Sequence, residues 1–412
     1  MKKVITILLS TLFMVSMSLG LTACGHEHEL TKTSAVSATC ETNGNSEYYT
    51  CECGKYFSDA EGKNEIAKDS WIISSTGHDH GDEIVYKVIE GKAYSVKTCA
   101  CGDEDKTEIA NAVVVDNTAE AQAAIDGVAE NTTIVLNDAN YGILYFRKTA
   151  SSTPVESNWA GGGHSYSGVI SGLTILGTEG AIVRKIKAET LDYTPSGNQH
   201  SNSATEPYLS FSLTINNLTI KNVKFELEGN DVAVDVLDND SSVNGLTLVG
   251  CSFVDKSNTS TATDGTRVLH SSSQEKVVKN VVIEDCYLKD LHQGIKINAL
   301  ENFKLVNSTF DSIKLHAMLF SGGSTTNLNK SGKIEIKDNE IVGSMGERFI
   351  RMTAVNAGAE VVVSGNVVAS GITMGQDADI VKITNVSPTA SVEVDNTNVW
   401  GEKTVTIEKI TA

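Results

Sequence analysis

The segment Leu218-Thr-Ile-Lys-Asn222-Val-Lys-Phe225 contains a pattern that recurs through the C-terminal half of the chain. Apolar residues occupy its first, third and eighth places, and Asn, Asp or Gly occupies its fifth place. The further copies begin at Leu246, Val281, Phe303, Ile334, Val361 and Val392. Alternating apolar residues predict a strand with one buried face. A residue that tolerates a left-handed backbone predicts a bend at the fifth place, followed by a second short strand.

These copies begin 22 to 35 residues apart, a spacing typical of proteins built from stacked repeats. One copy cannot bury its apolar face, whereas a stack of copies forms a continuous core. The pattern resembles the right-handed parallel β-helix of the pectate-lyase-like superfamily, over about residues 115–412. The resemblance implies an all-β domain, residues 113–412, that is a β-solenoid. The competing interpretation, an antiparallel β-sandwich, would show hairpin dipeptides and no constant phrase.

A short helix is expected where this domain begins. Residues 117–130 carry apolar side chains at helical spacing, and Asn117 or Thr118 can cap the first turn. Such a helix resembles the N-terminal plug of parallel β-helices, which covers the exposed end of the core. Farther along, Cys251 and Cys286 occupy the same place in consecutive copies. We expect them to be stacked, as buried core thiols or as a disulfide.

The N-terminus predicts export and a lipid anchor. Lys2 and Lys3 precede an apolar run that ends in Leu21-Thr-Ala-Cys24. This pattern is that of a secretory signal, residues 1–23, and its end resembles a bacterial lipobox. The resemblance implies that the Cys24 thiol is acylated and holds the protein on the outer face of the cell membrane. The alternative is a transmembrane anchor. The formal net charge of −19 argues against nucleic acid as a partner.

Two modules rich in Cys and His follow, residues 24–76 and 77–112. Both contain a Cys-x-Cys-Gly phrase, and the second module has no counterpart of Cys40. The phrase resembles zinc-ribbon-like modules repeated in surface proteins of Gram-positive gut bacteria. The resemblance implies a structural Zn²⁺ in each module, because thiolate and imidazole are ligands that Zn²⁺ prefers. Disulfides, which an extracellular location permits, and idle thiols are the alternatives. The candidate ligands are His28, Cys40, Cys51, Cys53, His78, His80, Cys99 and Cys101.

A third strand of each copy predicts a basic surface lane on an otherwise acidic protein. The residues expected to point outward are Asp235, Leu269, Lys296, Leu319, Arg351 and Lys382. Just before these strands lies a second row, in which His316, Arg348 and Asp379 are candidate substrate-binding residues. In the long segment 148–212, Trp159, His164 and Tyr166 could form a sugar-stacking rim or belong to a solvated loop.

Several functions remain open at this level. The family resemblance implies that polysaccharide binds along such a lane, with Lys296 or Arg351 as candidates for the base of a lyase. We identify no set of carboxylates suited to Ca²⁺ and no pair suited to glycoside hydrolysis. The leading hypothesis is a lipid-anchored surface protein that binds polysaccharide or another surface without catalysis. The alternatives are a polysaccharide lyase or hydrolase, and an adhesin or structural stalk.

Overall fold

The chain forms two compact units, in which the regular elements are β-strands apart from one short helix. The computed structural model describes residues 28–127, 129–142, 144–146, 169–184, 207–211, 214–229, 232–236, 242–257, 265–271, 273–274, 276–375 and 379–411. The first unit contains the described residues up to Glu83 together with Thr98–Asp105, and the second contains Ile84–Lys97 and Lys106 onward. The expected module 77–112 is therefore divided between them, with its Cys and His residues in the first unit.

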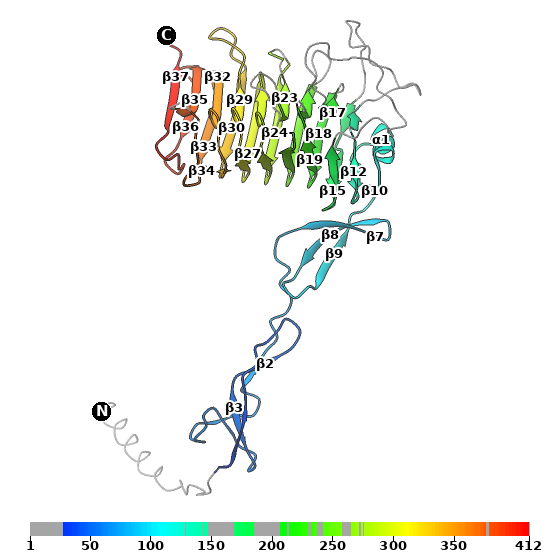
Figure 1. Cartoon of the computed structure of the whole chain (residues 1–412), viewed down its shortest axis with the longest axis vertical. Coiled ribbons are helices and arrows are strands. Elements are labelled where there is room, and N and C mark those ends of the chain that lie inside the picture. Colours follow the sequence, from blue (N-terminus) through cyan, green and yellow to red (C-terminus); the bar gives the residue numbers. More distant parts are fainter. Residues whose placement is uncertain are drawn as a thin grey trace, which may run out of the picture. The chain divides into compact units, whose positions relative to one another are not determined.

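The first unit, the Cys/His unit, is a small antiparallel structure (Figure 1). It has few buried apolar side chains. Trp71 lies under the rings of Tyr48 and Tyr56, at centroid distances of 4.1 and 4.5 Å. Phe57 is the other buried aromatic residue in the part of this unit that the structure describes. Its strands are β1 (Leu30–Thr33), β2 (Gly44–Asn45), β3 (Tyr48–Cys51), β4 (Tyr56–Phe57), β5 (Glu65–Ile66) and β6 (Ile72–Ile73).

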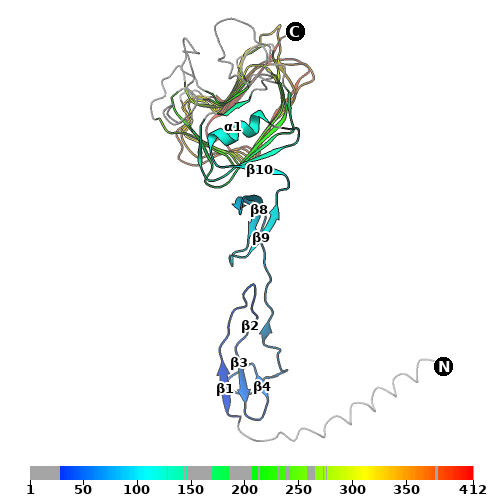
Figure 2. The same cartoon turned by 90° about the vertical axis from the view of Figure 1, so that its right-hand side faces the viewer.

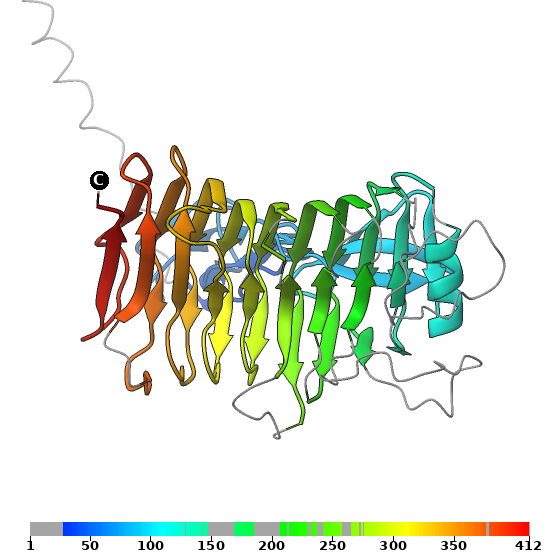
Figure 3. The same cartoon turned by 90° about the horizontal axis from the view of Figure 1, so that it is seen from above.

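The second unit, the parallel-sheet unit, is built from three ladders of parallel strands (Figure 3). The A ladder contains β10 (Ala112–Val115), β11 (Thr133–Leu136), β14 (Val169–Ser171), β15 (Thr174–Gly177), β18 (Thr214–Lys221), β21 (Ser242–Val249), β24 (Val278–Glu284), β27 (Leu300–Val306), β30 (Lys330–Lys337), β33 (Glu360–Ser364) and β36 (Ser391–Val394). The B ladder contains β13 (Leu144–Phe146), β17 (Pro207–Phe211), β20 (Val232–Val236), β23 (Arg267–Ser271), β26 (Ile295–Ile297), β29 (Met318–Phe320), β32 (Ile350–Val355), β35 (Asp379–Val386) and β37 (Thr404–Lys409). The C ladder contains β12 (Asn140–Tyr141), β16 (Ile182–Arg184), β19 (Lys224–Leu227), β22 (Ser252–Asp255), β25 (Tyr287–Lys289), β28 (Thr309–Asp311), β31 (Glu340–Ile341) and β34 (Val367–Val368).

Parallel pairing decides between the two fold interpretations. Every pairing recorded between A-ladder strands, and between C-ladder strands, is parallel. The antiparallel sandwich is therefore wrong, because its strands would alternate in direction. The unit is all-β with large parallel sheets, an arrangement consistent with the expected β-helix. A three-stranded sheet, β7 (Val85–Ile89), β8 (Lys92–Thr98) and β9 (Glu104–Glu108), comes before the three ladders in the chain, and Ala93 of β8 packs against Val135 and Leu176.

The repeat predicted from the sequence is confirmed in register. The first residues of the seven copies stack directly on one another: Leu218, Leu246, Val281, Phe303, Ile334, Val361 and Val392. The fifth place has positive φ in the first six copies, at Asn222, Gly250, Asp285, Asn307, Asp338 and Gly365. Asn and Asp tolerate this conformation better than other residues with a side chain, which is why they recur at the bend.

The core runs the length of the unit and includes a polar row at the sixth place of the repeat. Ser308, Asn339 and Asn366 are fully buried there. The Asn339 side-chain amide donates to Asn366 Oδ1 at 2.8 Å, and the Asn366 amide donates to Asn398 Oδ1 at 2.8 Å. Each of these buried side-chain amides thus has a hydrogen-bond partner in the next copy, as buried polar groups require. In two earlier copies this place holds Cys251 and Cys286, both buried free thiols, as the core-filler interpretation predicts.

The expected capping helix is present as α1 (Thr118–Asp126). The Asn117 side chain accepts a hydrogen bond from the Glu120 N–H at 3.0 Å and forms the N-cap. Ala121 and Ile125 are buried in the core cluster, and α1 lies across one end of the stacked ladders (Figure 2). The helix therefore shields apolar side chains at that end, as a solenoid terminus requires.

Candidate functional site

The Cys/His unit contains two clusters of possible metal ligands. His28, Cys51 and Cys53 form one cluster, and Cys40, His78, Cys99 and Cys101 form the other. Within each cluster all ligand atoms lie within 4.8 Å of one another. Cys40 therefore belongs with the second Cys-x-Cys pair, not with the pair of its own sequence module. This grouping supplies the residue that the second module lacks.

Each Cys-x-Cys pair is held by the same local turn. The N–H of Gly54 donates to Cys51 O at 2.9 Å, and the N–H of Gly102 donates to Cys99 O at 2.8 Å. Both glycines have a left-handed backbone, with φ of 84° and 92°. A residue with a Cβ is strained in that conformation, so the glycine lets the chain double back. The turn brings the two thiols of each pair to one side.

The donor atoms of the clusters fit a metal of the size of Zn²⁺. His28 Nδ1 lies 3.2 Å from Cys51 Sγ and 3.5 Å from Cys53 Sγ, and His78 Nδ1 lies 3.2 Å from Cys101 Sγ. Ligands placed 2.0–2.3 Å from a tetrahedral Zn²⁺ are about 3.5 Å apart. A side-chain hydrogen bond with Cys53 raises the pKa of the Cys51 thiol. A divalent cation between the sulfur atoms would offset the repulsion of two thiolates.

One of the expected ligands of this unit, His80, turns out differently. His80 lies outside both clusters, and its Nε2 contacts Asp103 Oδ2 at 2.8 Å. The same carboxylate oxygen lies 3.8 Å from His78 Nδ1. None of the seven cysteines that the structure describes is in a disulfide. Cys24, the predicted lipidation site, lies outside the described residues.

The basic lane is present on the B ladder, with one correction. Lys296, Leu319, Arg351 and Lys382 pair successively across β26, β29, β32 and β35, as expected. The prediction for β23 is wrong by one residue: His270 pairs with Lys296, and Leu269 is fully buried. Val268 and Leu269 are adjacent apolar residues, so the alternation of inward and outward side chains could be placed in two ways on this strand. The sequence pattern alone could not decide between them.

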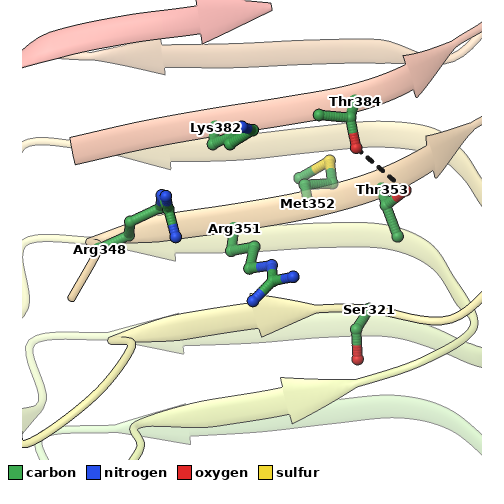
Figure 4. Close-up of a pocket in the computed structure, with 7 residues that line it drawn as sticks. All are labelled: Ser321, Arg348, Arg351, Met352, Thr353, Lys382 and Thr384. Carbon is green, nitrogen blue, oxygen red and sulfur yellow. Dashed lines mark hydrogen bonds between the residues drawn. The ribbon is translucent and has the colours of Figure 1, made fainter. Parts of the chain in front are cut away.

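A hollow of about 230 Å³ opens where this lane is most basic (Figure 4). Three cationic side chains and three hydroxyl groups surround it, together with one methionine. The lining residues are Ser321, Arg348, Arg351, Met352, Thr353, Lys382 and Thr384. Arg351 is exposed. Lys382 Nζ lies 4.0 Å from Glu408 Oε1, and the Glu408 side chain is 59% exposed. Lys296, the other candidate base, does not line the hollow, since Leu319 separates it from Arg351 in the register.

The second row has mixed roles. His316 is buried, and its Nε2 lies 2.9 Å from Glu347 Oε2. Asp379 Oδ1 accepts hydrogen bonds from Thr406 and Thr404 at 2.7 and 2.9 Å. These hydrogen bonds, together with the positive charges of nearby Lys382 and Arg348, lower the pKa of the Asp379 carboxyl group. Of the three predicted residues, Arg348 alone lines the hollow. Trp159, His164 and Tyr166 lie outside the described residues.

Lys330 is a polar residue of the region that the sequence reasoning missed. Its side chain is fully buried, and Nζ donates to Ser321 O, Gly322 O and Asn329 Oδ1 at 2.7–2.8 Å. Burial lowers the pKa of this ammonium group to about 7. A signal was available, because Lys330 stacks on Leu300, which stacks on Val278. A charged residue at a place that is otherwise apolar indicates a specific set of partners.

Comparison with known proteins adds no identification. No family model, no curated protein and no solved structure matches the chain. In the parts of the chain that the structure describes, no helix has the length and apolar character needed to span a bilayer. Beyond the two Cys/His clusters, the described residues contain no third group of three close His, Cys, Asp or Glu side chains suited to a metal. The function must therefore be inferred from the residues themselves.

Proposed function

We propose that this protein is a lipid-anchored cell-surface β-helix that binds an acidic polysaccharide without catalysis. Cys24 would carry the lipid after removal of residues 1–23, and a right-handed parallel β-helix related to the pectate-lyase-like proteins would form the binding domain. The observation that carries the proposal is the cationic hollow at Arg348, Arg351 and Lys382 on a chain of net charge −19. Local positive potential on an acidic protein favours an anionic ligand.

The size and lining of the hollow favour one charged group of a longer polymer. Its volume of about 230 Å³ is below the roughly 300–1,000 Å³ typical of small-molecule pockets. Arginine binds carboxylate and sulfate groups with two parallel hydrogen bonds, and hydroxyl groups such as that of Thr353 suit sugar oxygens. Neighbouring outward residues of the B ladder continue the surface on both sides, so a chain could extend along it.

The lining also favours binding over lyase or hydrolase chemistry. None of the seven side chains that line the hollow is a carboxylate. A lyase needs a base and a group that neutralises the uronate, and a hydrolase of the usual kind needs two carboxylates. Arg351 could neutralise a uronate, but a guanidinium with its high pKa is a poor base at neutral pH. The lyase and the adhesin therefore remain second to the binding hypothesis.

The metal clusters have a separate, structural part in the proposal. Three cysteines and one histidine in the second cluster form a donor set typical of a structural zinc site. We propose that Zn²⁺ stabilises the Cys/His unit, which has too few buried apolar residues to be stable on its own. The unit would then link Cys24 to the binding domain along the chain.

A glycan-binding assay tests the proposed function. Immobilised uronate-containing, sulfated and neutral polysaccharides are compared for binding of the purified protein, and we expect binding to the acidic ones only. Arg351→Gln and Lys382→Met should each weaken binding about tenfold or more, and added salt should weaken it further. Lys289→Met is the matched control, because it removes the same charge from an exposed lysine on β25 of the C ladder.

Three results would contradict the proposal. Equal binding of neutral and acidic polysaccharides, unaffected by the two substitutions, would exclude the hollow as an anionic site. A rise in ultraviolet absorbance during incubation with a uronate polymer would indicate unsaturated products and would favour the lyase. Absence of glycan binding, with retention on a protein partner, would favour the adhesin.

A further inference from the structure

The two metal clusters differ in the number of ligands that the described residues supply. The cluster of Cys40, His78, Cys99 and Cys101 offers four donors, which complete a tetrahedral site. The cluster of His28, Cys51 and Cys53 offers three donors among the described residues. Three protein ligands with a fourth position left for another molecule are typical of zinc sites that react or exchange, not of closed structural ones.

The three donors are held firmly enough to define an open position. Cys51 is buried at the end of β3, where Leu30 of β1 pairs with it. The His28 ring packs on buried Phe57 at a centroid distance of 4.8 Å. A Cβ at Gly62 would lie 3.5 Å from the His28 ring, so the loop around Gly62 closes against the histidine. Two of the ligands therefore keep their positions through packing as well as through a metal.

The third donor faces solvent. Cys53 is exposed, whereas Cys51 is buried beneath the same turn. A metal bound by these atoms would have protein on the side of Cys51 and Phe57 and water on the side of Cys53. A fourth ligand would thus enter from solvent without displacement of packed side chains. In the four-donor cluster, by contrast, Cys40 fills the corresponding coordination position.

We infer that the His28/Cys51/Cys53 cluster is a metal centre with one exchangeable coordination position, open to a small nitrogen or sulfur donor such as imidazole. The Cys40/His78/Cys99/Cys101 cluster is a closed centre that has no such position. This inference rests on the metal binding proposed above. It assigns the two centres different roles: one holds the fold, and the other accepts a ligand from outside the unit.

Cobalt substitution tests the inference, because Co²⁺ takes the place of Zn²⁺ and has visible absorption that reports its ligands. The full chain is loaded with Co²⁺, the bound metal is counted, and imidazole is added. We expect two Co²⁺ per chain and a saturable spectral change that involves one of them. Cys53→Ser should abolish the change, and the matched variant Cys101→Ser, at the same position of the other pair, should retain it.

The outcomes separate the inference from the proposal on which it rests. A chain that binds no Co²⁺ overturns the proposed metal binding itself. Two bound Co²⁺ with no response to imidazole overturn only the open position. A response that survives Cys53→Ser but disappears in Cys101→Ser assigns the open position to the other cluster and also overturns the inference. His26 lies two residues before His28 in the sequence and outside the described residues. A response seen only in His26→Ala identifies His26 as a fourth ligand and has the same consequence. Should Cys53→Ser fail to fold, His28→Gln serves as the second variant.

Discussion

Ile283 of β24 pairs directly with Leu305 of β27, and both side chains are fully buried in the core of the parallel-sheet unit. Substitution of either residue by alanine removes methyl groups and leaves a cavity that stacked strands cannot easily close. We expect each substitution to lower the free energy of unfolding by about 2–5 kcal/mol. Denaturant titration of the purified variants measures the loss.

Lys296→Ala is the control for this prediction. Lys296 lies between buried Ile295 and Ile297 but points to the outer face of β26. Its truncation should change the free energy of unfolding by no more than about 0.5 kcal/mol. A costly Lys296→Ala beside a harmless Ile283→Ala would show that the inward and outward sets are exchanged, since a slip of one residue reverses the faces of a strand.

The buried ammonium of Lys330 makes stability depend on pH. Its pKa is lowered to about 7 in the folded protein and is near 10.5 in the unfolded chain. Between these values the unfolded state binds more protons, so the free energy of unfolding should rise with pH, by at most about 1.4 kcal/mol per pH unit. Lys330→Met should remove this part of the slope. Lys333→Met, on the exposed face of the same strand, is the control; equal slopes in all three proteins would refute the prediction.

Removal of metal should unfold the Cys/His unit and leave the parallel-sheet unit intact. The reason is that metal binding supplies the folding free energy that the few buried apolar residues around Phe57 and Trp71 cannot supply. Limited proteolysis with mass spectrometry, with and without a chelator, locates the cleavage sites. We expect new cuts within residues 28–83 and 98–105 only. Stable disulfides among the five cysteines of this unit in unreduced protein would contradict the idea.

The predicted lipid modification depends on one thiol. Cys24→Ala should leave the signal segment uncleaved by the lipoprotein pathway and should abolish labelling with a radioactive fatty acid, because the acyl acceptor is gone. Cys53→Ser is a suitable control, since it removes a thiol that the lipobox does not contain. Incorporation of label into the Cys24→Ala protein would refute the assignment.

The A and C ladders could be predicted from the sequence because a single short phrase encodes both the strand and its bend. Alternating apolar residues fix the buried face, and Asn222, Asp285 and Asn307 fix where the chain turns. The B ladder was harder, because the segments before its strands vary in length. At Val268 and Leu269, two adjacent apolar residues left the alternation of inward and outward side chains undetermined. Only the pairing of Leu269 with buried Ile295 resolves it.

The candidate sites were predicted in part. The sequence identified Arg351 and Lys382 as outward cations and Arg348 as a candidate substrate-binding residue, but it could not indicate that Ser321, Thr353 and Thr384 complete a hollow around them. Those three are common residues with no distinctive spacing. Likewise, ligand types in the Cys/His unit were evident, whereas the grouping of Cys40 with Cys99 and Cys101 depends on how the chain folds back.

That grouping has a consequence for the history of the gene. A repeat of the parallel-sheet unit contacts only its neighbours, so one could be gained or lost while the rest keep their register. The two Cys/His repeats lack this independence. Because Cys40 lies in the first repeat and completes the centre of the second, a duplication or deletion at the repeat boundary would leave one centre a ligand short. Recombination should therefore transfer the two Cys/His repeats together, as one unit.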